Sequence, residues 1–373
     1  MLNDLETQHK LHQPLNEREH DMLNDSETQQ GLFNRRDFMR STAGGAAATV
    51  LAGGLGQTAL ARELLATKPS ETYVKLLYES LTEKQRKEMC FDWGQVTGDR
   101  GVLRTHISNN WRITRPGILS NFYTSDQQAL IRQVFEGMLN PDWIERFDKQ
   151  LQDDMGGYGK AQSIAIFGKP GEGKFEFVLS GRHLTLRCDG NTTEHVAFGA
   201  PIVYGHSVTP YYEKPAHPGN VFWHQAKAAN EVYQMLDGEQ RKQALAPEAP
   251  DEGLIAFQGK KGNFPGVPIA AMSGDQKAAI QGVLQKLIEP FRKTDRDEVL
   301  ASLKSQGGLD QCSLCFYRRD DLGDDGVWDN WRIEGPSFVW HFRGAPHVHV
   351  WVHVADDSSV ALNSKNLSGP LRK

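Results

Sequence analysis

The chain has 373 residues, of which 39% are hydrophobic and 24% are charged, an ordinary composition for a globular protein of one large or two medium domains. Its formal net charge of -5 at pH 7 excludes the broad positive surface that nucleic-acid binding usually needs. The sequence also lacks a run of about 20 apolar residues that would cross a bilayer. We therefore expect no nucleic-acid partner and no membrane span in the mature protein.

The N-terminal segment has the pattern of an export signal. Residues 34–40, Asn-Arg-Arg-Asp-Phe-Met-Arg, match the twin-arginine signal, in which two arginines precede an apolar pair and a basic residue. A mildly apolar stretch follows at residues 41–60, and residues 59–61, Ala-Leu-Ala, have the small-x-small form of a signal peptidase site. We expect the mature protein to begin near Arg62, after passage through the twin-arginine translocase to the periplasm or the extracellular space.

The first 33 residues are polar and contain a near-repeat, in which residues 22–29 resemble residues 1–8. They show no apolar periodicity, so we expect a disordered leader in front of the signal, or a true start at Met22. The predicted organisation is a leader and signal peptide at 1–61, followed by a mature domain at 62–373.

Four helices are expected because four segments begin with a capping box. In each box a Thr, Asp or Ser side chain accepts a hydrogen bond from the amide three residues on, where a Gln side chain reaches back. Apolar residues recur with helical spacing in the second segment, at 130, 131, 134 and 135, and in the fourth, at 280, 283, 284 and 287, so both helices are amphipathic. The predicted caps are Thr82, Thr124, Asp237 and Ser273.

Seven segments are typical of β-strands because β-branched and aromatic residues are frequent in them. They are residues 163–167, 174–179, 183–188, 313–317, 331–334, 338–342 and 347–354.

The two halves of the mature chain correspond in sequence. The first caps of the two halves are 155 residues apart, the second caps are 149 apart, and the hairpin glycines Gly181 and Gly335 are 154 apart. A nearly constant spacing of this kind indicates an internal repeat. We predict an α+β fold made by tandem duplication of a helix-helix-antiparallel β unit, with pseudo-repeats at about 70–215 and 220–356 and with the helices packed on the β-sheet.

Two motifs imitate functional sites. Cys312 and Cys315 have the spacing of a redox pair, but they fall at a predicted strand, in which residues three apart point to opposite faces, so we expect buried free thiols. Residues 168–174, Gly-Lys-Pro-Gly-Glu-Gly-Lys, imitate a phosphate-binding loop. Phe175 replaces its Ser or Thr and a strand follows in place of a helix, so we expect a hairpin turn.

The most informative segment is the predicted strand at 347–354, His-Val-His-Val-Trp-Val-His-Val. Alternation places every valine on one face and His347, His349, Trp351 and His353 on the other. His347 and His349 are close enough to share a metal, whereas His353 lies about 13 Å from His349 on a regular strand, too far to share it. We predict a divalent transition metal, zinc, copper or iron, because neutral imidazole binds each of them.

The third ligand has two candidates. His341 precedes a turn at residues 343–346, and this hairpin is expected to set His341 across from His347. His183 leads the corresponding predicted strand of the other half. Two further histidines, in Gly/Pro-rich loops, are able to close the site: His206 and His217.

These segments carry a resemblance to a known bacterial family. Residues 81–86, 180–189, 236–241, 331–338 and 340–349 together resemble the family catalogued as domain of unknown function 3500, over roughly residues 70–356. The family typically shows Gly-His-His-Leu where this chain has Gly181-Arg182-His183-Leu184, so one of two histidines is replaced and His183 remains. The resemblance supports the extent of the domain and the choice of histidines, and it implies no particular reaction.

We predict an exported metal-dependent enzyme, either a hydrolase or an oxidoreductase. Zinc activates bound water, whereas copper or iron supports oxidative chemistry. The candidate metal ligands are His347, His349, His341 and His183. The candidate proton carriers and anion-binding groups are Glu334, Tyr204, Arg343 and Arg182. The alternatives are a non-catalytic metal- or ligand-binding protein of the cell envelope and a structural histidine cluster without metal.

Overall fold

The computed structural model describes residues 69–98, 101–207, 221–323 and 325–360. They all lie within Leu51–Lys373, one of the two units into which the chain divides. The predicted leader and export signal fall outside the described residues, and so does His217.

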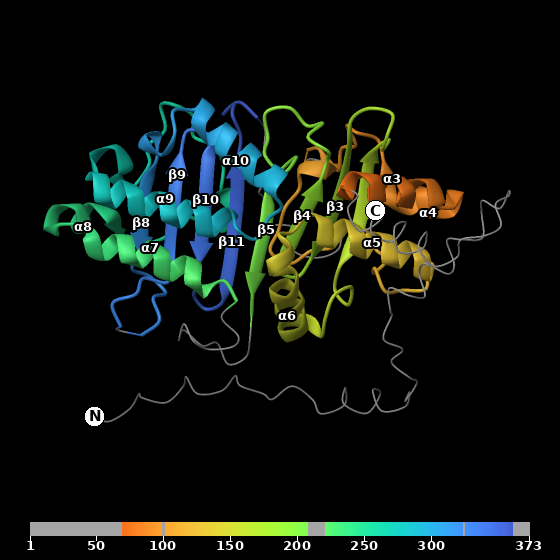
Figure 1. Cartoon of the computed structure of the whole chain (residues 1–373), viewed down its shortest axis with the longest axis horizontal. Helices are drawn as coiled ribbons and strands as arrows, with labels where there is room; N and C mark the ends of the chain where they lie inside the picture. The colour runs from red at the N-terminus through yellow and green to blue at the C-terminus, as the bar shows by residue number, and fades with distance from the viewer. Residues whose placement is uncertain (1–68, 99–100, 208–220, 324, 361–373) are drawn as a thin grey trace, which may run out of the picture. The chain divides into compact units, whose positions relative to one another are not determined.

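Eight α-helices are present in these residues (Figure 1): α3 (Ser70–Ser80), α4 (Glu83–Met89), α5 (Ser125–Gly137), α6 (Ile144–Met155), α7 (Trp223–Met235), α8 (Gly238–Ala244), α9 (Gly274–Ile288) and α10 (Lys293–Ser305). The eleven strands are β1 (Cys90–Phe91), β2 (Ser163–Gly168), β3 (Phe175–Gly181), β4 (Leu184–Cys188), β5 (Ile202–His206), β6 (Leu245–Ala246), β7 (Val267–Pro268), β8 (Ser313–Tyr317), β9 (Asn330–Gly335), β10 (Phe338–Arg343) and β11 (Val348–Val354). This content confirms the predicted α+β class.

All eleven strands belong to one mixed sheet. Its order is β1-β2-β3-β4-β5-β11-β10-β9-β8-β6, with β7 paired to β8 outside this path. The short outer strands β1 and β6 run parallel to β2 and β8, and the strands between them are antiparallel to their neighbours. The central pair is β5 with β11, where Gly205 lies opposite His349 and Tyr204 lies opposite Val350.

The order of elements repeats along the chain. In the first half α3, α4 and β1 precede α5, α6 and the strands β2 to β5. In the second half α7, α8, β6 and β7 precede α9, α10 and the strands β8 to β11. Each half therefore contributes four antiparallel strands and one short parallel strand, the second half adds β7, and the halves meet at β5 and β11. Duplication of one ancestral unit stays a prediction.

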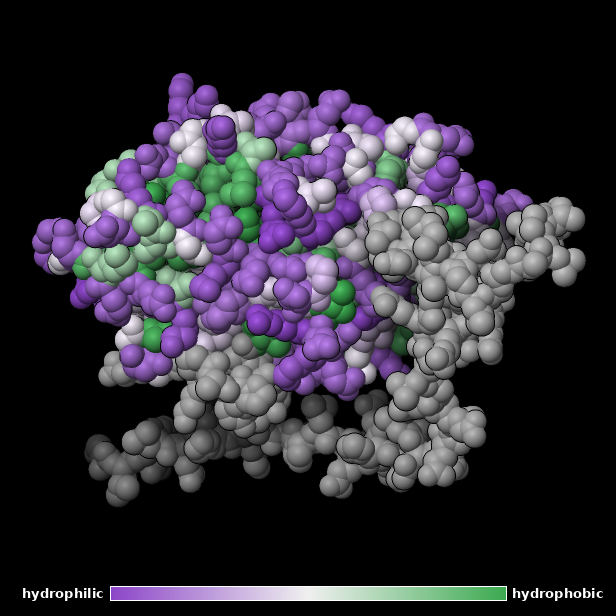
Figure 2. Space-filling model, viewed as in Figure 1, coloured by the Kyte–Doolittle hydropathy of each residue, from purple (hydrophilic) through white to green (hydrophobic). Residues whose placement is uncertain are grey.

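Helices cover one face of the sheet. α6 contacts β5, α7 contacts β9 and α10 contacts β11, and Figure 1 shows these helices crossing the strands on the viewer's side. Aromatic rings fill this interface: the ring of Tyr204 lies 4.8 Å from that of Phe222 and 5.8 Å from that of Phe291. The outer surface on this side is mainly hydrophilic, with separate apolar patches (Figure 2). None of the described helices is long and apolar enough to cross a membrane.

The opposite face of the sheet is covered by irregular segments and short 3-10 turns. Two of these turns are η3 (Leu103–Thr105) and η5 (Glu252–Leu254). Ile107 and Ile255, which follow these turns, pack on Val203, Val339 and Trp351 of the sheet. Because Trp351 and His349 alternate with the valines of β11, the histidines of this strand lie under the irregular cover.

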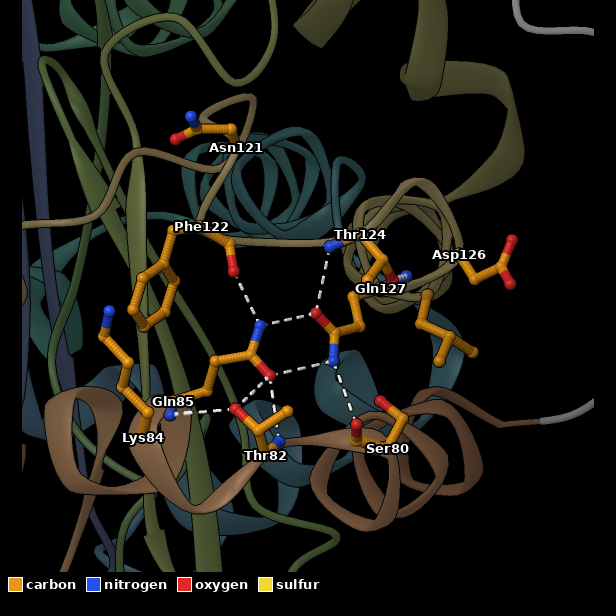
Figure 3. A pocket seen from close by; sticks show the side chains of 10 residues that line it. Ser80, Thr82, Lys84, Gln85, Asn121, Phe122, Thr124, Asp126 and Gln127 are labelled. Carbon is orange, nitrogen blue, oxygen red and sulfur yellow. Dashed lines mark hydrogen bonds between the residues drawn. The ribbon is translucent and has the colours of Figure 1, made fainter.

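All four predicted capping boxes are confirmed, with caps at Thr82, Thr124, Asp237 and Ser273. The glutamines of these boxes also pair between helices. The amides of Gln85 and Gln127 bond to each other at 2.7 and 3.1 Å, and those of Gln240 and Gln276 do so at 3.2 and 2.8 Å. Figure 3 shows the first pair beside a surface pocket of about 430 Å³. The same device therefore joins α4 to α5 and α8 to α9.

The predicted strands are found with small changes at their ends, apart from one correction. The sequence predicts a strand that begins at His183, but Gly181 pairs with Leu184, so Arg182 and His183 form a two-residue turn. β5 has no counterpart among the predicted strands. It is short and contains Gly205, and a glycine weakens the strand pattern.

The two motifs that imitate functional sites, the glycine-rich segment and the cysteine pair, both have the structural roles that the sequence predicts. Residues 169–174 connect the antiparallel strands β2 and β3, so the segment is a hairpin turn. Cys312 and Cys315 are buried free thiols. Burial raises the pKa of the Cys312 thiol to about 12 and that of the Cys315 thiol to about 11. Both thiols therefore stay protonated and unreactive at neutral pH.

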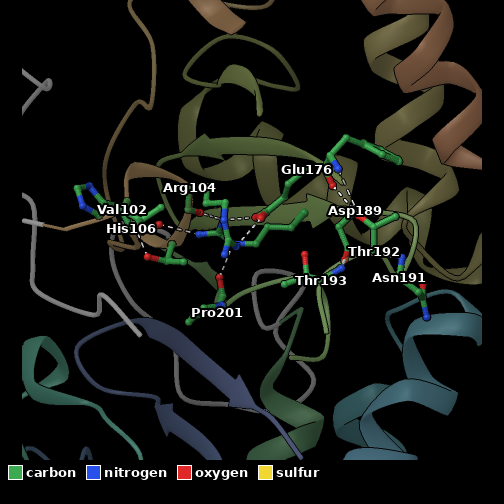
Figure 4. Close-up of polar contacts among 12 residues, drawn as sticks. Val102, Arg104, His106, Glu176, Asp189, Asn191, Thr192, Thr193 and Pro201 are labelled. Carbon is green, nitrogen blue, oxygen red and sulfur yellow. Dashed lines mark hydrogen bonds and ion pairs between the residues drawn. The ribbon is translucent and has the colours of Figure 1, made fainter. Parts of the chain in front are cut away.

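A buried ion pair anchors the irregular cover to the sheet (Figure 4). Arg187 of β4 and Glu176 of β3 are both buried, and Arg187 Nη1 lies 2.6 Å from Glu176 Oε1. Arg187 also donates to the carbonyl oxygens of His106 at 2.6 Å and Pro201 at 2.7 Å. Arg104 adds a second ion pair to Glu176 at 3.2 Å. The guanidinium of Arg187 therefore holds the η3 segment and the entry to β5 on the sheet.

We expect Arg187→Met to lower the free energy of unfolding by about 3–5 kcal/mol, because the variant leaves the buried Glu176 carboxylate without its main partner. Chemical denaturation followed by circular dichroism measures this change. Lys242→Met is the matched control. Lys242 forms an exposed pair with Glu239 at 2.7 Å, and its loss should change the unfolding free energy by less than about 1 kcal/mol. Equal effects of the two substitutions would contradict the anchoring role.

Candidate metal centre

His183 is held in a strained turn. Its φ is 50°, a left-handed conformation that costs a non-glycine residue about 1–3 kcal/mol. The amide of His183 donates to the carbonyl oxygen of Asn109 at 2.6 Å, which secures the turn. Strain of this kind persists only where the surrounding structure enforces it, and it is concentrated at functional sites.

The other two histidines come from the start of β11. His349 pairs with Arg343 of β10 on one side and with Gly205 of β5 on the other. His347 immediately precedes the strand. The predicted alternation is confirmed, since Val350 lies opposite Tyr204 on the helical face while His349 projects from the opposite face.

Gly205 makes room for the histidines to meet. β5 lies between β4 and β11, so His183 and His349 are two strands apart, about 9–10 Å at the backbone. A Cβ atom on Gly205 would lie 2.1 Å from the carbonyl oxygen of Val348 and 3.4 Å from His183 Cβ. Because Gly205 has no side chain, the rings of His183 and His349 approach above it, with their centroids 4.8 Å apart.

Together the three imidazoles form one cluster, which we call the histidine cluster. The ring centroids of His183 and His347 are 4.9 Å apart, and those of His347 and His349 are 4.6 Å apart. One nitrogen from each residue lies within 4.8 Å of the other two, and Nε2 of His347 is 2.9 Å from Nε2 of His349. Two imidazole nitrogens on one tetrahedral metal are about 3.3 Å apart at bond lengths of 2.0–2.1 Å. The spacing therefore suits a shared metal ion.

Two carboxylates face the outer nitrogens of the cluster. Asp154 Oδ2, near the end of α6, lies 2.6 Å from His183 Nδ1. Glu252 Oε2, in η5, lies 3.1 Å from His349 Nδ1, and Asn109 Nδ2 lies 3.1 Å from the same atom. At His183 the carboxylate holds the ring proton on Nδ1 and leaves the lone pair of Nε2 for a metal, as is typical of metal-bound histidines. Nδ1 of His349 faces nitrogen donors of Asn109 and Arg343 as well as its carboxylate.

Burial keeps two of these imidazoles neutral. It lowers the pKa of His347 to about 4 and that of His349 well below its usual value, and the positive charge of Arg343 adds to both effects. Neutral imidazole is the form that binds a metal. The cluster is therefore ready to accept a metal at neutral pH with little release of protons.

The predicted site residues divide into two groups. The structure brings together His183, His347, His349 and Arg343. It places outside the cluster His341, His206, His353, Tyr204 and Glu334.

His341 does not lie across from His347, and that prediction is wrong. The register pairs Arg343 with His349 and His341 with Trp351, four residues further along the strand than expected, because residues 344–347 form the loop between β10 and β11. The buried His341 accepts a hydrogen bond at Nδ1 from Arg332 Nε at 3.3 Å. His183, the other candidate, occupies the third place in the cluster.

Neither predicted proton carrier reaches the histidine cluster. Tyr204 lies on the helical face, where its hydroxyl donates to Gln225 Oε1 at 2.9 Å. Glu334 lies on β9, where it pairs with Arg332 at 3.2 Å and accepts from Gln258 Nε2 at 2.8 Å. Both side chains have structural partners.

Sequence reasoning missed both carboxylates of the site. Asp154 is 29 residues before His183 and Glu252 is 97 residues before His349, so no local spacing connects either acid to its histidine. Only the end of α6 and the turn η5 bring them into contact.

The fold and the histidine cluster together define an α+β protein with a possible three-histidine metal site. The chain belongs to the family described as "Protein of unknown function (DUF3500)", which matches residues 66–355. This match confirms the resemblance found in the sequence, and it spans every residue of the cluster. No curated protein and no solved structure matches the chain.

If the cluster binds a metal, protein purified without a histidine tag should hold a divalent transition metal in stoichiometric amount, measured by inductively coupled plasma mass spectrometry. His183→Ala and His349→Ala should each lower this content to a small fraction, because two imidazoles hold such an ion weakly. His195→Ala is the matched control. That imidazole is exposed and pairs with Asp356 at 2.8 Å, so its loss should leave the metal content unchanged.

The carboxylate that contacts His183 allows a second test, in which metal binding is weakened and not abolished. Asp154→Asn should weaken metal affinity by about 10–100-fold, because the amide no longer supplies the negative charge that makes His183 a better ligand. Competition with a chelator measures the affinity. Unchanged metal content in every histidine variant, together with unchanged affinity in Asp154→Asn, would exclude the cluster as the binding site.

Proposed function

We propose that this protein is a metal-dependent enzyme, a hydrolase or an oxidoreductase, with His183, His347 and His349 as the metal ligands. The observation that carries the proposal is the convergence of three imidazoles, two of which have a carboxylate partner at Nδ1. Buried histidines that serve only packing have no need of a strained turn.

The number of ligands favours catalysis over storage of a metal. Structural zinc sites are closed by four protein ligands, whereas catalytic sites have three and keep an open position for water or substrate. Within the described residues the candidate group contains three side chains, and His347 is the least buried of them. A zinc ion here would activate water, and copper or iron would support oxidative chemistry.

The second candidate function is non-catalytic binding of a metal or ligand in the cell envelope. The observation that favours it is the burial of the cluster, since His183 and His349 are only 3% and 2% exposed. A binding protein needs no substrate cleft at its metal.

An open coordination position separates the two functions. If the site is catalytic, azide added to the cobalt(II)-loaded protein should bind the metal and shift its visible absorption. The spectrum of the azide-free protein should also titrate with a midpoint near pH 7, as the metal-bound water loses a proton. Absence of both changes in a protein that holds stoichiometric cobalt would mean a closed site and would favour the binding protein.

We also propose export by the twin-arginine route to the periplasm or the extracellular space. The support is the run at residues 34–40 and the Ala-Leu-Ala sequence at residues 59–61, both outside the described part of the chain. This route carries folded proteins, so a metal bound before export would travel with the chain.

Changing Arg35 and Arg36 together to Lys should prevent export, because the translocase recognises the arginine pair. The precursor should then remain in the cytoplasm, as seen by fractionation and immunoblotting. Arg18→Lys, in the leader but outside the motif, is the control and should be exported and cleaved near Arg62. Export of the double variant at the control level would contradict the twin-arginine route.

A further inference from the structure

We propose that the histidine cluster takes a substrate with an oxyanion group, a carboxylate or a phosphate, held between the metal and the guanidinium groups of Arg182 and Arg343. This inference deepens the proposed function and rests on it, because it assigns the substrate class of the same site. It is carried by the position of the two arginines and by the guanidinium nitrogens that their acidic partners leave unbound.

Arg182 presents a free guanidinium edge beside the cluster. It is the residue next to His183 in the β3–β4 turn, and its Nε donates to Asp154 Oδ1 at 3.0 Å. The other oxygen of Asp154 faces His183, so one carboxylate holds both side chains. The side chain of Arg182 is 33% exposed, and its two terminal nitrogens form no hydrogen bond or ion pair with the described residues. These nitrogens remain for an external acceptor.

Arg343 lies against the ligand atom of His349. Its Nη2 is 2.6 Å from Nδ1 and 3.0 Å from Nε2 of that ring, and its Nε is 3.3 Å from Glu252 Oε1. The side chain is 27% exposed, and Nη1 has no hydrogen-bond or ion-pair partner in the described part of the chain. A guanidinium therefore stands next to the nitrogen that would hold the metal.

The balance of charge at the cluster favours an anion. Asp154 pairs with Arg182 and Glu252 pairs with Arg343, so each arginine next to the cluster has one acidic partner. The charge of a divalent metal is then left without compensation, close to two guanidinium groups that repel it. An oxyanion bound to the metal removes this repulsion and accepts hydrogen bonds from the planar guanidinium fork, which matches carboxylate and phosphate geometry.

The corresponding hairpin of the other half shows that the fold itself needs neither an arginine nor a histidine at this turn. Pro336 and Ser337 connect β9 to β10 there. The amide of Ser337 donates to Gln306 Oε1 at 3.0 Å, in the role that the carboxylate of Asp154 has beside Arg182 and His183. A turn of the same length thus forms without an arginine or a histidine, so Arg182 and His183 serve the site and not the hairpin.

The test is isothermal titration calorimetry of inorganic phosphate into the cobalt(II)-loaded protein. Wild type should bind phosphate, and Arg182→Gln and Arg343→Gln should each weaken binding by at least about 10-fold, since each removes a charge-assisted hydrogen-bond donor. Arg182→Lys should recover only part of the loss, because an ammonium group is a point charge without the fork. Arg241→Gln, in which the arginine caps carbonyl oxygens at the end of α7, controls for lost positive charge and should bind like wild type.

Cobalt content, measured on each sample before titration, separates the two ways of failing. Stoichiometric cobalt with phosphate affinity that is equal in wild type, Arg182→Gln and Arg343→Gln would overturn the oxyanion site and leave the metal site intact. A wild-type protein that holds no cobalt would overturn the proposed function itself, and this inference with it. An equal weakening of phosphate binding in Arg241→Gln would also overturn the inference. Phosphate affinity would then depend on the overall positive charge of the protein and not on the two arginines beside the cluster.

Discussion

The antiparallel pairing of β5 with β11 is the constraint on which the rest of this structure depends. It joins the two halves at the centre of the sheet and sets Gly205 opposite His349. Since β4 lies on the other side of β5, this register also places His183 within reach across a residue that has no side chain. A shift of the β5–β11 register by one residue would place His349 on the helical face of the sheet, and the histidine cluster would not form. The histidine cluster is therefore formed by the contact between the halves and belongs to neither half alone.

Near the contact between β5 and β11 the protein contains features that lower its stability and that a purely structural sheet would not need. A non-glycine residue stands in a left-handed turn, and charged side chains lie under an irregular cover, among them the buried pair of Arg187 with Glu176. The helical face of the same sheet is packed with aromatic rings. The helices therefore supply the stability. One of the two acidic contacts of the cluster comes from an irregular segment, and the other comes from the end of α6.

Short sequence motifs predicted the parts of the structure that depend on interactions between residues close together in the chain. Every helix with a capping box was predictable, and the four helices without a side-chain N-cap bond, α3, α6, α7 and α10, were not. His347 and His349 followed from strand alternation. The choice between His341 and His183 could not be made, because it depends on a loop that shifts the β10–β11 register and on pairing between distant strands. Asp154 and Glu252 were missed for the same reason.

X-ray absorption spectroscopy at the edge of the bound metal tests the central claim most directly, because it reports the ligands of the ion without any substitution. The account predicts scattering from three imidazole groups at about 2.0–2.1 Å, with a further light atom in the fourth position and no sulfur. A first shell that contains sulfur, or one with fewer than two imidazole groups, would contradict a metal centre built from His183, His347 and His349.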